Sequence, residues 1–275
     1  MIFYSMKSIV KKLLPTFLIS GYHFGLAFLA AFWYCFPSRK LKVIGVTGTS
    51  GKSTVVAMIA EILESSGLKV ASLSSTRIRL AGEEKPNKLR MTMPGRFFLQ
   101  RFLKRAAKEG CQYAVLEVSS EGIKQYRHCF IDFDSAVLTN LSPEHIESHG
   151  SFEKYREAKE KLFQATKNIH IINIDDENAK YFLKFPSKQK FCYSLKIESL
   201  KIENYKFIKA TDINASSSGI NFKVENTAFY LHLLWEFNIY NALAAISAAK
   251  YQGIGLEICK KTLESVKGVH GRMEE

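Results

Sequence analysis

The sequence has no closely spaced pair of cysteines. Its five cysteines are odd in number, widely spaced and never in a C-x-x-C arrangement. This usage disfavours a disulfide framework and a zinc site. Reduced thiols in a cytoplasmic protein are the simplest interpretation. The sequence also lacks internal repeats and low-complexity tracts.

The sequence also has no long run of lysine or arginine, although its net charge is +13. The excess is spread along the chain, so we expect no nucleic-acid partner. A basic protein without such a run favours smaller anionic partners, such as nucleotides and phosphates, or an acidic membrane face. With 275 residues, 47% of them hydrophobic, the chain is long enough to bury a core in one large or two modest domains.

Residues 1–40 differ from the rest. A strongly apolar stretch at 17–36 follows Lys7, Lys11 and Lys12, and no small-residue cleavage site follows it. Three interpretations stay open: a helix that crosses the membrane, a helix at the membrane surface, and a helix packed on the rest of the protein. We expect a cytoplasmic protein, with association at the inner face of the membrane as the open alternative.

A glycine-rich turn at 45–54 follows the apolar run 41–46 and precedes a helical pattern. Strand, glycine-rich turn and helix form the context of a phosphate-binding loop. Its N–H groups and the helix dipole attract phosphate, Lys52 is placed to reach the terminal phosphates, and Ser53 is placed to bind Mg²⁺. A plain surface turn is the alternative, and Gly-Lys-Ser directly after a strand disfavours it.

Strand-like and helix-like patterns alternate from residue 41 to 180, which predicts an α/β fold. We expect a P-loop-type, mostly parallel sheet flanked by helices, with a small antiparallel β section and an N-terminal apolar helix. Gly67 and Gly110 stand where helices should end. The predicted strands are 41–46, 69–73, 113–118, 135–139 and 170–173, and the predicted helices are 53–65, 97–108, 152–165, 238–251 and 256–266. Short antiparallel strands are predicted at 191–195, 205–208, 219–224 and 228–233.

Several chemically active side chains follow predicted strands. Glu117 closes one strand, where a carboxylate near a phosphate loop is a natural Mg²⁺ ligand or simply a solvated strand end. His145, in a loop after the next strand, could coordinate a metal. His149 is more weakly placed. By pattern alone, Lys159 would be an exposed lysine on an amphipathic helix.

Taken together, these motifs resemble the Mur ligase family, which joins amino acids to cell-wall precursors with ATP. The loop is similar to the family's Gly-Thr-x-Gly-Lys-Thr/Ser-Thr/Ser, although Val46 stands where the standard phosphate-binding pattern has glycine. The similarity is greatest to the type that adds the third peptide residue to UDP-N-acetylmuramoyl-L-alanyl-D-glutamate (MurE-type). The matching segments are 91–94, 99–100, 117–120, 125–127, 139–150, 155–159, 172–177, 237–245 and 271–274.

The resemblance implies a role for each matched residue. The nucleotide would be held by Gly48, Thr49, Ser50, Gly51, Lys52, Ser53, Thr54, Asn238, Asn241 and Arg272. Two Mg²⁺ ions would be held by Ser53, Glu117, His145 and Lys159. The UDP-linked muramyl dipeptide would contact Thr92, Ser119, Gln125 and Arg127. Lys52, Lys159 and His145 would serve catalysis, and Lys159 would be carbamylated, which turns a cation into the oxygen-donating anion that Mg²⁺ prefers.

The resemblance also divides the chain. We expect an apolar helical segment at 1–40, in place of the family's uridine-binding domain, and the central ATP-binding domain at 41–275. Because the chain ends on the family's Gly-Arg-Met-Glu motif, we expect the C-terminal ligase domain to be absent. Met91, Met93 and Glu121 depart from the family pattern in segments that would contact the dipeptide.

Three functions follow as hypotheses. The first is an ATP-dependent amide ligase of peptidoglycan precursor synthesis, which acts through an acyl phosphate and takes the UDP-linked dipeptide and an amino acid. The second is a related Mur or folylpolyglutamate-type ligase with another substrate. The third is a membrane-tethered nucleotide-binding protein without ligase activity. The spacing of Gln125 and Arg127 favours the first.

Overall fold

The computed structural model describes residues 16–89, 91–144, 146–196 and 205–266. Its centre is an 11-stranded sheet with the order β11-β10-β9-β8-β7-β6-β1-β5-β2-β3-β4. Neighbouring strands from β9 to β2 are parallel, and antiparallel strands complete both edges. The strands are β1 (Lys42–Thr47), β2 (Val70–Leu73), β3 (Arg77–Leu80), β4 (Glu83–Pro86), β5 (Tyr113–Glu117), β6 (Phe133–Leu138), β7 (Ile169–Asn173), β8 (Gln189–Ser194), β9 (Tyr205–Ser216), β10 (Gly219–Val224) and β11 (Thr227–Leu231).

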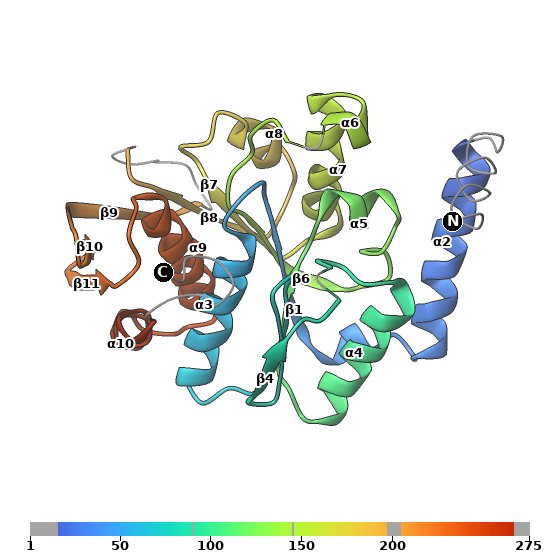
Figure 1. Cartoon of the computed structure of the whole chain (residues 1–275), viewed down its shortest axis with the longest axis horizontal. Helices are drawn as coiled ribbons and strands as arrows, with labels where there is room; N and C mark the ends of the chain where they lie inside the picture. Colours follow the sequence, from blue (N-terminus) through green and yellow to red (C-terminus); the bar gives the residue numbers. More distant parts are fainter. Residues whose placement is uncertain (1–15, 90, 145, 197–204, 267–275) are drawn as a thin grey trace.

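Helices cover both faces of this sheet (Figure 1). On one face lie α3 (Lys52–Ser65), α9 (Phe237–Tyr251) and α10 (Leu256–Ser265), and on the other lie α4 (Arg96–Lys108), α5 (Ser120–Lys124), α7 (Phe152–Ala165) and α8 (Ala179–Leu183). Alternate residues of the central strands belong to the two hydrophobic cores, one on each face of the sheet. Ile44 of β1 packs with α3 and α9, while Val43 packs with α4 and α7. A strand buried on both faces explains the continuous apolar runs of the sequence.

The site lies where the strand order changes direction. The chain leaves β1, crosses through α3 to β2, and later returns to place β5 and β6 on either side of β1. The loops that follow the carboxyl ends of these strands therefore meet above β1, where ligands bind in open α/β sheets.

The predicted α/β class, the parallel sheet and the helix ends are confirmed. Gly67 and Gly110 follow α3 and α4 with φ of 86° and 77°, the left-handed conformation that ends helices. The antiparallel prediction is right for β10 and β11. It is wrong for β8, which pairs in parallel with β7 and β9, and for residues 205–208 of β9, which take part in that parallel pairing. β9 pairs antiparallel with β10 only from Ala210 to Ser216. Alternation along a strand predicts its faces and not the direction of its neighbours, whereas the burial of successive residues of β8 is typical of a parallel strand.

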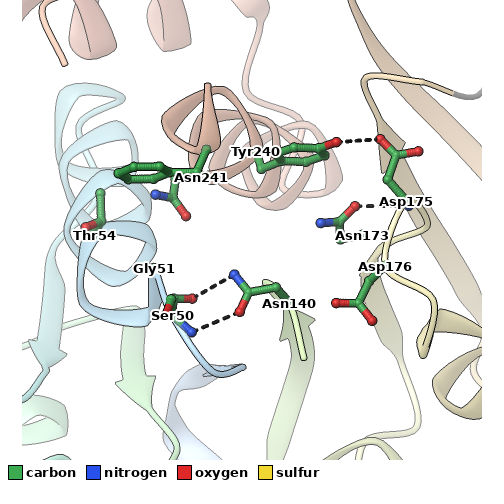
Figure 2. A pocket seen from close by; sticks show the side chains of 10 residues that line it. Ser50, Gly51, Thr54, Asn140, Asn173, Asp175, Asp176, Tyr240 and Asn241 are labelled. Atoms are coloured by element: carbon green, nitrogen blue, oxygen red, sulfur yellow. Dashed lines mark hydrogen bonds between the residues drawn. The ribbon is translucent and has the colours of Figure 1, made fainter. Parts of the chain in front are cut away.

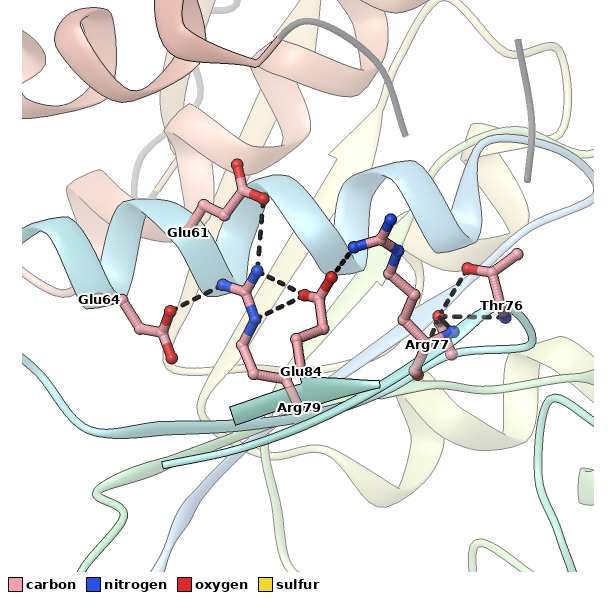
Figure 3. Close-up of polar contacts among 7 residues, drawn as sticks. Glu61, Glu64, Thr76, Arg77, Arg79 and Glu84 are labelled. Atoms are coloured by element: carbon pink, nitrogen blue, oxygen red, sulfur yellow. Dashed lines mark hydrogen bonds and ion pairs between the residues drawn. The ribbon is translucent and has the colours of Figure 1, made fainter. Parts of the chain in front are cut away.

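The β3–β4 hairpin was not predicted, and an ion-pair cluster ties it to α3 (Figure 3). Arg79 of β3 lies 2.7 Å from Glu64 and 3.4 Å from Glu61 of α3, and 2.5 Å from Glu84 of β4. Burial raises the pKa of Glu64, and the nearby Arg79 opposes that shift. The cluster fixes the hairpin beside the helix that follows the glycine-rich loop.

The apolar segment forms α2 (Thr16–Trp33), followed by the short helix η1 (Pro37–Lys40). It packs beside α4 at the periphery of the molecule (Figure 1). Within the described ranges, no helix is both long enough and apolar enough to cross a membrane.

Candidate nucleotide and metal site

The loop between β1 and α3 depends on two glycines. Gly48 has φ of 150°, and a Cβ there would lie 1.9 Å from Thr139 Oγ1. Gly51 has φ of 80°, and a Cβ there would lie 2.3 Å from Asn241 Oδ1. Only glycine fits both the backbone angles and the space, so the curvature of this loop is dictated by the sequence.

The loop is fastened to the segment after β6. The Ser50 N–H donates to Asn140 Oδ1 at 2.9 Å, and Asn140 Nδ2 and Thr139 Oγ1 donate to the Ser50 carbonyl at 3.2 and 2.7 Å. Thr49 Oγ1 lies 3.1 Å from the Tyr155 hydroxyl on α7. These bonds hold the loop in a set shape, which lowers the cost of ordering it around a ligand.

The first turn of α3 faces the loop. Gly51 is its N-cap and makes no side-chain cap, so the dipole end of the helix is directed at the loop. Lys52 folds back over the loop, where its Nζ donates to the carbonyls of Gly48 and Thr49 at 3.0 and 2.7 Å. A flexible ammonium group at this position can turn toward a phosphate without backbone movement.

A cavity of ≈ 580 Å³ opens on one side of the loop (Figure 2). The lining residues come from the loop, from segments after β6 and β7, and from α9: Ser50, Gly51, Thr54, Asn140, Asn173, Asp175, Asp176, Phe237, Tyr240 and Asn241. One apolar wall and a few fixed polar groups are typical of a small-molecule site.

Asp175 and Tyr240 form the polar edge of this cavity. Burial alone would raise the pKa of Asp175, but donors from Ser194, Leu195, Tyr240 and Lys196 outweigh it and hold that pKa below its usual value. The Tyr240 hydroxyl donates to the carboxylate at 3.0 Å, and burial raises the pKa of the phenol. Asp175 is therefore a fixed anionic acceptor.

A second cavity of ≈ 190 Å³ lies on the other side of the loop. It is small and polar. Two lysines and two glutamates, side chains suited to phosphate and metal chemistry, line it. Its lining residues are Thr49, Lys52, Ser75, Thr92, Glu117, Ser119, Ser120, Glu144, Tyr155 and Lys159. The structure thus brings Lys52, Glu117 and Lys159 together from positions far apart in the chain.

Glu117 and Ser53 meet in this region. The Ser53 hydroxyl and the Ser75 N–H both donate to Glu117 Oε2 at 2.8 Å. Glu117 is only 3% exposed, and it stands at the carboxyl end of β5. The contact with Ser53 excludes the alternative of a solvated strand end for this carboxylate.

Lys159 is almost completely buried, with 1% of its surface exposed. Its Nζ donates to the Gly48 carbonyl at 2.7 Å and lies 4.5 Å from the centre of the Tyr155 ring. Burial, and then the nearby positive charge of Lys52, lower the pKa of this amine well below its usual value, while Glu144 and Glu117 oppose the shift. The pattern-based interpretation of Lys159 as an exposed lysine is therefore wrong.

The candidate substrate residues fall into two groups. Thr92 and Ser119 line the smaller cavity, and Ser119 also caps α5 by accepting from the Gly122 N–H at 3.1 Å. Gln125 and Arg127 lie farther along, joined by a bond of 2.8 Å from Arg127 Nη2 to Gln125 Oε1. Arg127 also donates to the carbonyl of Met93, which fixes both residues relative to the segment before α4.

His145 and Arg272 lie outside the described residues. Asn238 is fully buried and does not line the larger cavity: its Nδ2 donates to the Leu234 carbonyl at 2.5 Å, and its Oδ1 accepts from Asn241 at 3.1 Å. Its position orients Asn241 behind the loop.

Several lining residues had no predicted role. Asn140 and Asp175 lie inside matched motifs, so their positions were known but their contacts were not. Tyr155 was matched in the same way. Ser75 carries no sequence signal, because its importance comes from a backbone N–H that the β2–β3 turn aims at Glu117.

The fold and the glycine-rich loop define a P-loop α/β protein. The family model described as Mur ligase middle domain matches residues 46–249, and the chain belongs to the Mur ligase family.

Named relatives and a solved structure agree with this assignment. The UDP-N-acetylmuramoyl-L-alanyl-D-glutamate–2,6-diaminopimelate ligase of Clostridium tetani is 36% identical over 253 residues, covering 90% of this chain and 50% of the relative. The UDP-N-acetylmuramyl-tripeptide synthetase of Treponema denticola is 37% identical, covering 89% and 49%. A solved UDP-N-acetylmuramoyl-L-alanyl-D-glutamate–2,6-diaminopimelate ligase superposes with a TM-score of 0.73 at 32% identity, covering 85% and 48%. The chain thus spans about half the length of these relatives.

Proposed function

We propose that this chain carries the nucleotide site of an ATP-dependent, ADP-forming amide ligase that adds an amino acid to UDP-N-acetylmuramoyl-L-alanyl-D-glutamate. The observation that carries the proposal is that Lys52, Glu117 and Lys159 line one small cavity beside the glycine-rich loop. Two relatives that are 36% and 37% identical to this chain over the aligned residues bear the names of such ligases. The substrates are proposals, because the chain spans about half of each relative.

In this proposal the nucleotide lies across the loop. The base and ribose occupy the larger cavity, near Phe237, Tyr240 and Asp175. The phosphates lie over residues 48–54 and the first turn of α3, where backbone N–H groups and the helix dipole favour anions. Lys52 leaves the loop carbonyls and neutralises the terminal phosphates.

The donor set around Ser53 fits Mg²⁺. Its hydroxyl oxygen and Glu117 Oε2 are hard oxygen donors that lie 2.8 Å apart. Neighbouring ligands of an octahedral Mg²⁺ lie about 2.9 Å apart, given bonds of about 2.0–2.1 Å. Small rotations of the two side chains would let both bind the same ion. Bound Mg²⁺ would neutralise the charge between the phosphates and an attacking carboxylate.

As an amine, Lys159 does not fit a metal site, but its chemistry suits carbamylation. Burial lowers the pKa of this amine well below its usual value, which favours the neutral form. A neutral amine adds CO₂: an N–C bond forms and Nζ loses one proton. The product is a carbamate anion whose oxygens could serve a second Mg²⁺ together with Glu117. Carbamylation also removes the repulsion that an ammonium group would exert on the metal. The proposed set is completed by His145.

The precursor would reach the phosphates from the side of Thr92 and Ser119. Both residues line the same cavity as Lys159, and Gln125 and Arg127 extend the polar surface beyond it. A carboxylate held here attacks the terminal phosphorus of ATP, which forms an acyl phosphate and releases ADP. An amine then adds to the acyl carbon, and phosphate leaves. The chain's residues position and neutralise the reactants, and no protein nucleophile is required.

The test is ADP release by the full chain with ATP, Mg²⁺, UDP-N-acetylmuramoyl-L-alanyl-D-glutamate and candidate amines. ADP that forms only with both precursor and amine supports ligation. Turnover with a different acceptor would assign a related ligase. Nucleotide binding with no turnover in any mixture would contradict the ligase function and leave a nucleotide-binding role.

We also propose that the protein works in the cytoplasm, where ATP and the UDP-linked precursor are found. Contact between residues 1–40 and the inner face of the membrane is a separate proposal, because the nucleotide site does not depend on it.

A further inference from the structure

The helix α2 is firmly seated along one side. Ala27, Ala30 and Ala31 are buried, with exposed fractions of 2%, 0% and 0%. The rings of Phe24 and Phe28 lie 5.1 and 5.4 Å from that of Phe130, after α5. Small residues allow the helix to approach closely, and the aromatic contacts set its rotation about its own axis.

Arg96 of α4 ties the same helix to the polar surface near α5. Its guanidinium donates to the His23 carbonyl at 3.1 Å and to the Gln125 carbonyl at 2.6 Å. The helix is therefore part of the folded body, and its exposed side has a defined direction relative to the site.

The outer side of α2 is apolar and open to solvent. Leu18, Tyr22, Leu29 and Trp33 recur at helical spacing, and Trp33 is 75% exposed. Phe17 and Phe32 widen the stripe, and no charged residue occurs anywhere in α2. An exposed apolar patch of this kind marks an interaction surface.

Exposed cations follow α2 in the chain and occur on the helix that packs beside it. No aspartate or glutamate occurs in the first 60 residues. Arg39 and Lys40, which follow α2, are exposed. The adjacent α4 also has no acidic residue and exposes Arg101, Lys104, Arg105 and Lys108. An apolar face with basic flanks complements a surface that is apolar inside and anionic outside.

We propose that α2 docks in the plane of an anionic lipid surface. Its apolar stripe enters the interface, and the cations of α4 and of residues 39–40 meet the headgroups. A twofold dimer through the same stripe would bring two sets of these cations together, which opposes self-association. A spanning arrangement is incompatible with the packed side of α2, which is held by Phe130 and Arg96.

The experiment measures sedimentation of the full chain with vesicles of phosphatidylcholine and phosphatidylglycerol, and with phosphatidylcholine alone. One variant combines Leu29→Glu with Trp33→Glu, and its matched control combines Ile213→Glu with Ile258→Glu at exposed apolar positions far along the chain. A second α2 variant, Leu29→Gln with Trp33→Gln, removes the same apolar side chains without adding charge, in case the glutamates disturb folding. Circular dichroism checks that every variant is folded.

A second pair of variants tests the charges. Lys104→Glu with Arg105→Glu reverses two cations of α4, and Lys188→Glu with Lys206→Glu is the control at exposed lysines elsewhere. We expect each α2 or α4 variant to weaken binding to the anionic vesicles about tenfold or more, with each control near wild type. We also expect added salt to weaken binding.

Three results would overturn the proposal. One is no binding to anionic vesicles. Another is equal loss in the variants and their controls. The last is a concentration-dependent dimer that the α2 variants break while the wild type ignores vesicles, which would make the stripe a contact between copies. None of these results bears on ADP release, so the docking and the ligase function can fail independently.

Discussion

Replacement of Gly51 by alanine would test the geometry of the glycine-rich loop. Gly51 has φ of 80°, and the added Cβ would lie 2.3 Å from Asn241 Oδ1. The backbone strain costs about 1–2 kcal/mol. Displacement of the Asn241 carboxamide costs about 1 kcal/mol more, since its bond of 3.1 Å to Asn238 breaks. Stiffening of the unfolded chain returns about 0.5–1 kcal/mol, so we expect a net loss of about 2 kcal/mol.

The structure also predicts how this change combines with Asn241→Ala. That substitution alone should cost about 1 kcal/mol, because Asn238 loses its partner. In the double variant the clash is gone, so the total should stay near 2 kcal/mol instead of the additive 3 kcal/mol or so. Urea unfolding followed by circular dichroism measures all three variants.

Gly67→Ala provides the matched control. Gly67 has a similar φ of 86° but no atom within 4 Å of an added Cβ. It should show the strain alone, and its effect should add to that of Asn241→Ala. Additivity of Gly51→Ala with Asn241→Ala to within about 0.5 kcal/mol would refute the contact between the loop and α9.

Further predictions concern the buried groups. Lys159→Ala should abolish the carbamate signal that labelled bicarbonate gives in carbon NMR. It should also lower the rate of ADP release about 100-fold or more. An unchanged NMR signal would exclude Lys159 as the carbamylated residue. Burial lowers the pKa of His170 to about 4, so its contribution to stability is complete above pH 6.5 and is lost as the pH falls toward 4. Between pH 7.5 and 5 the free energy of unfolding should therefore fall by about 2 kcal/mol. Urea unfolding should show a smaller fall in His170→Gln. An equal pH dependence of stability in the wild type and the variant would contradict this prediction. Arg79→Leu leaves the carboxylates of its cluster without their shared cation (Figure 3) and should lower the free energy of unfolding by about 2 kcal/mol. The control Lys85→Leu, at an exposed position, should change it by no more than about 0.5 kcal/mol. Similar losses in both variants would show that the cluster does not stabilise the fold.

Local patterns predicted the glycine-rich loop and its surroundings well. A glycine-rich turn that follows an apolar run and ends in Gly51, Lys52 and Ser53 is typical of a phosphate-binding loop, and the structure has the strand, turn and helix in place. These features depend on residues that are neighbours in sequence, which is why they were accessible without a structure.

The convergence at the smaller cavity could not be read from patterns. Lys159 lies on a helix that looks amphipathic, and only the packing of α7 against the loop buries its amine. The resemblance to a family supplied its candidate role. Ser75 had no signal at all, because it acts through a backbone N–H.

The missed hairpin has a similar explanation. Arg79 and Glu84 are polar residues that usually face water, so the segment did not resemble a strand. Its turn is made by Ala81 and Gly82, both with positive φ, and its side chains are held by ion pairs to α3. Tertiary partners outweighed the local preference here.

The central claim is that one nucleotide and its metal lie between Lys52, Ser53, Glu117 and Lys159. A crystal structure of the full chain with Mg²⁺ and a non-hydrolysable ATP analogue tests it most directly. We expect the phosphates over residues 48–54, Lys52 turned from the loop carbonyls to the terminal phosphate, and Mg²⁺ bound to Ser53. A nucleotide bound elsewhere, or phosphates beyond the reach of Lys52 and Glu117, would contradict the account.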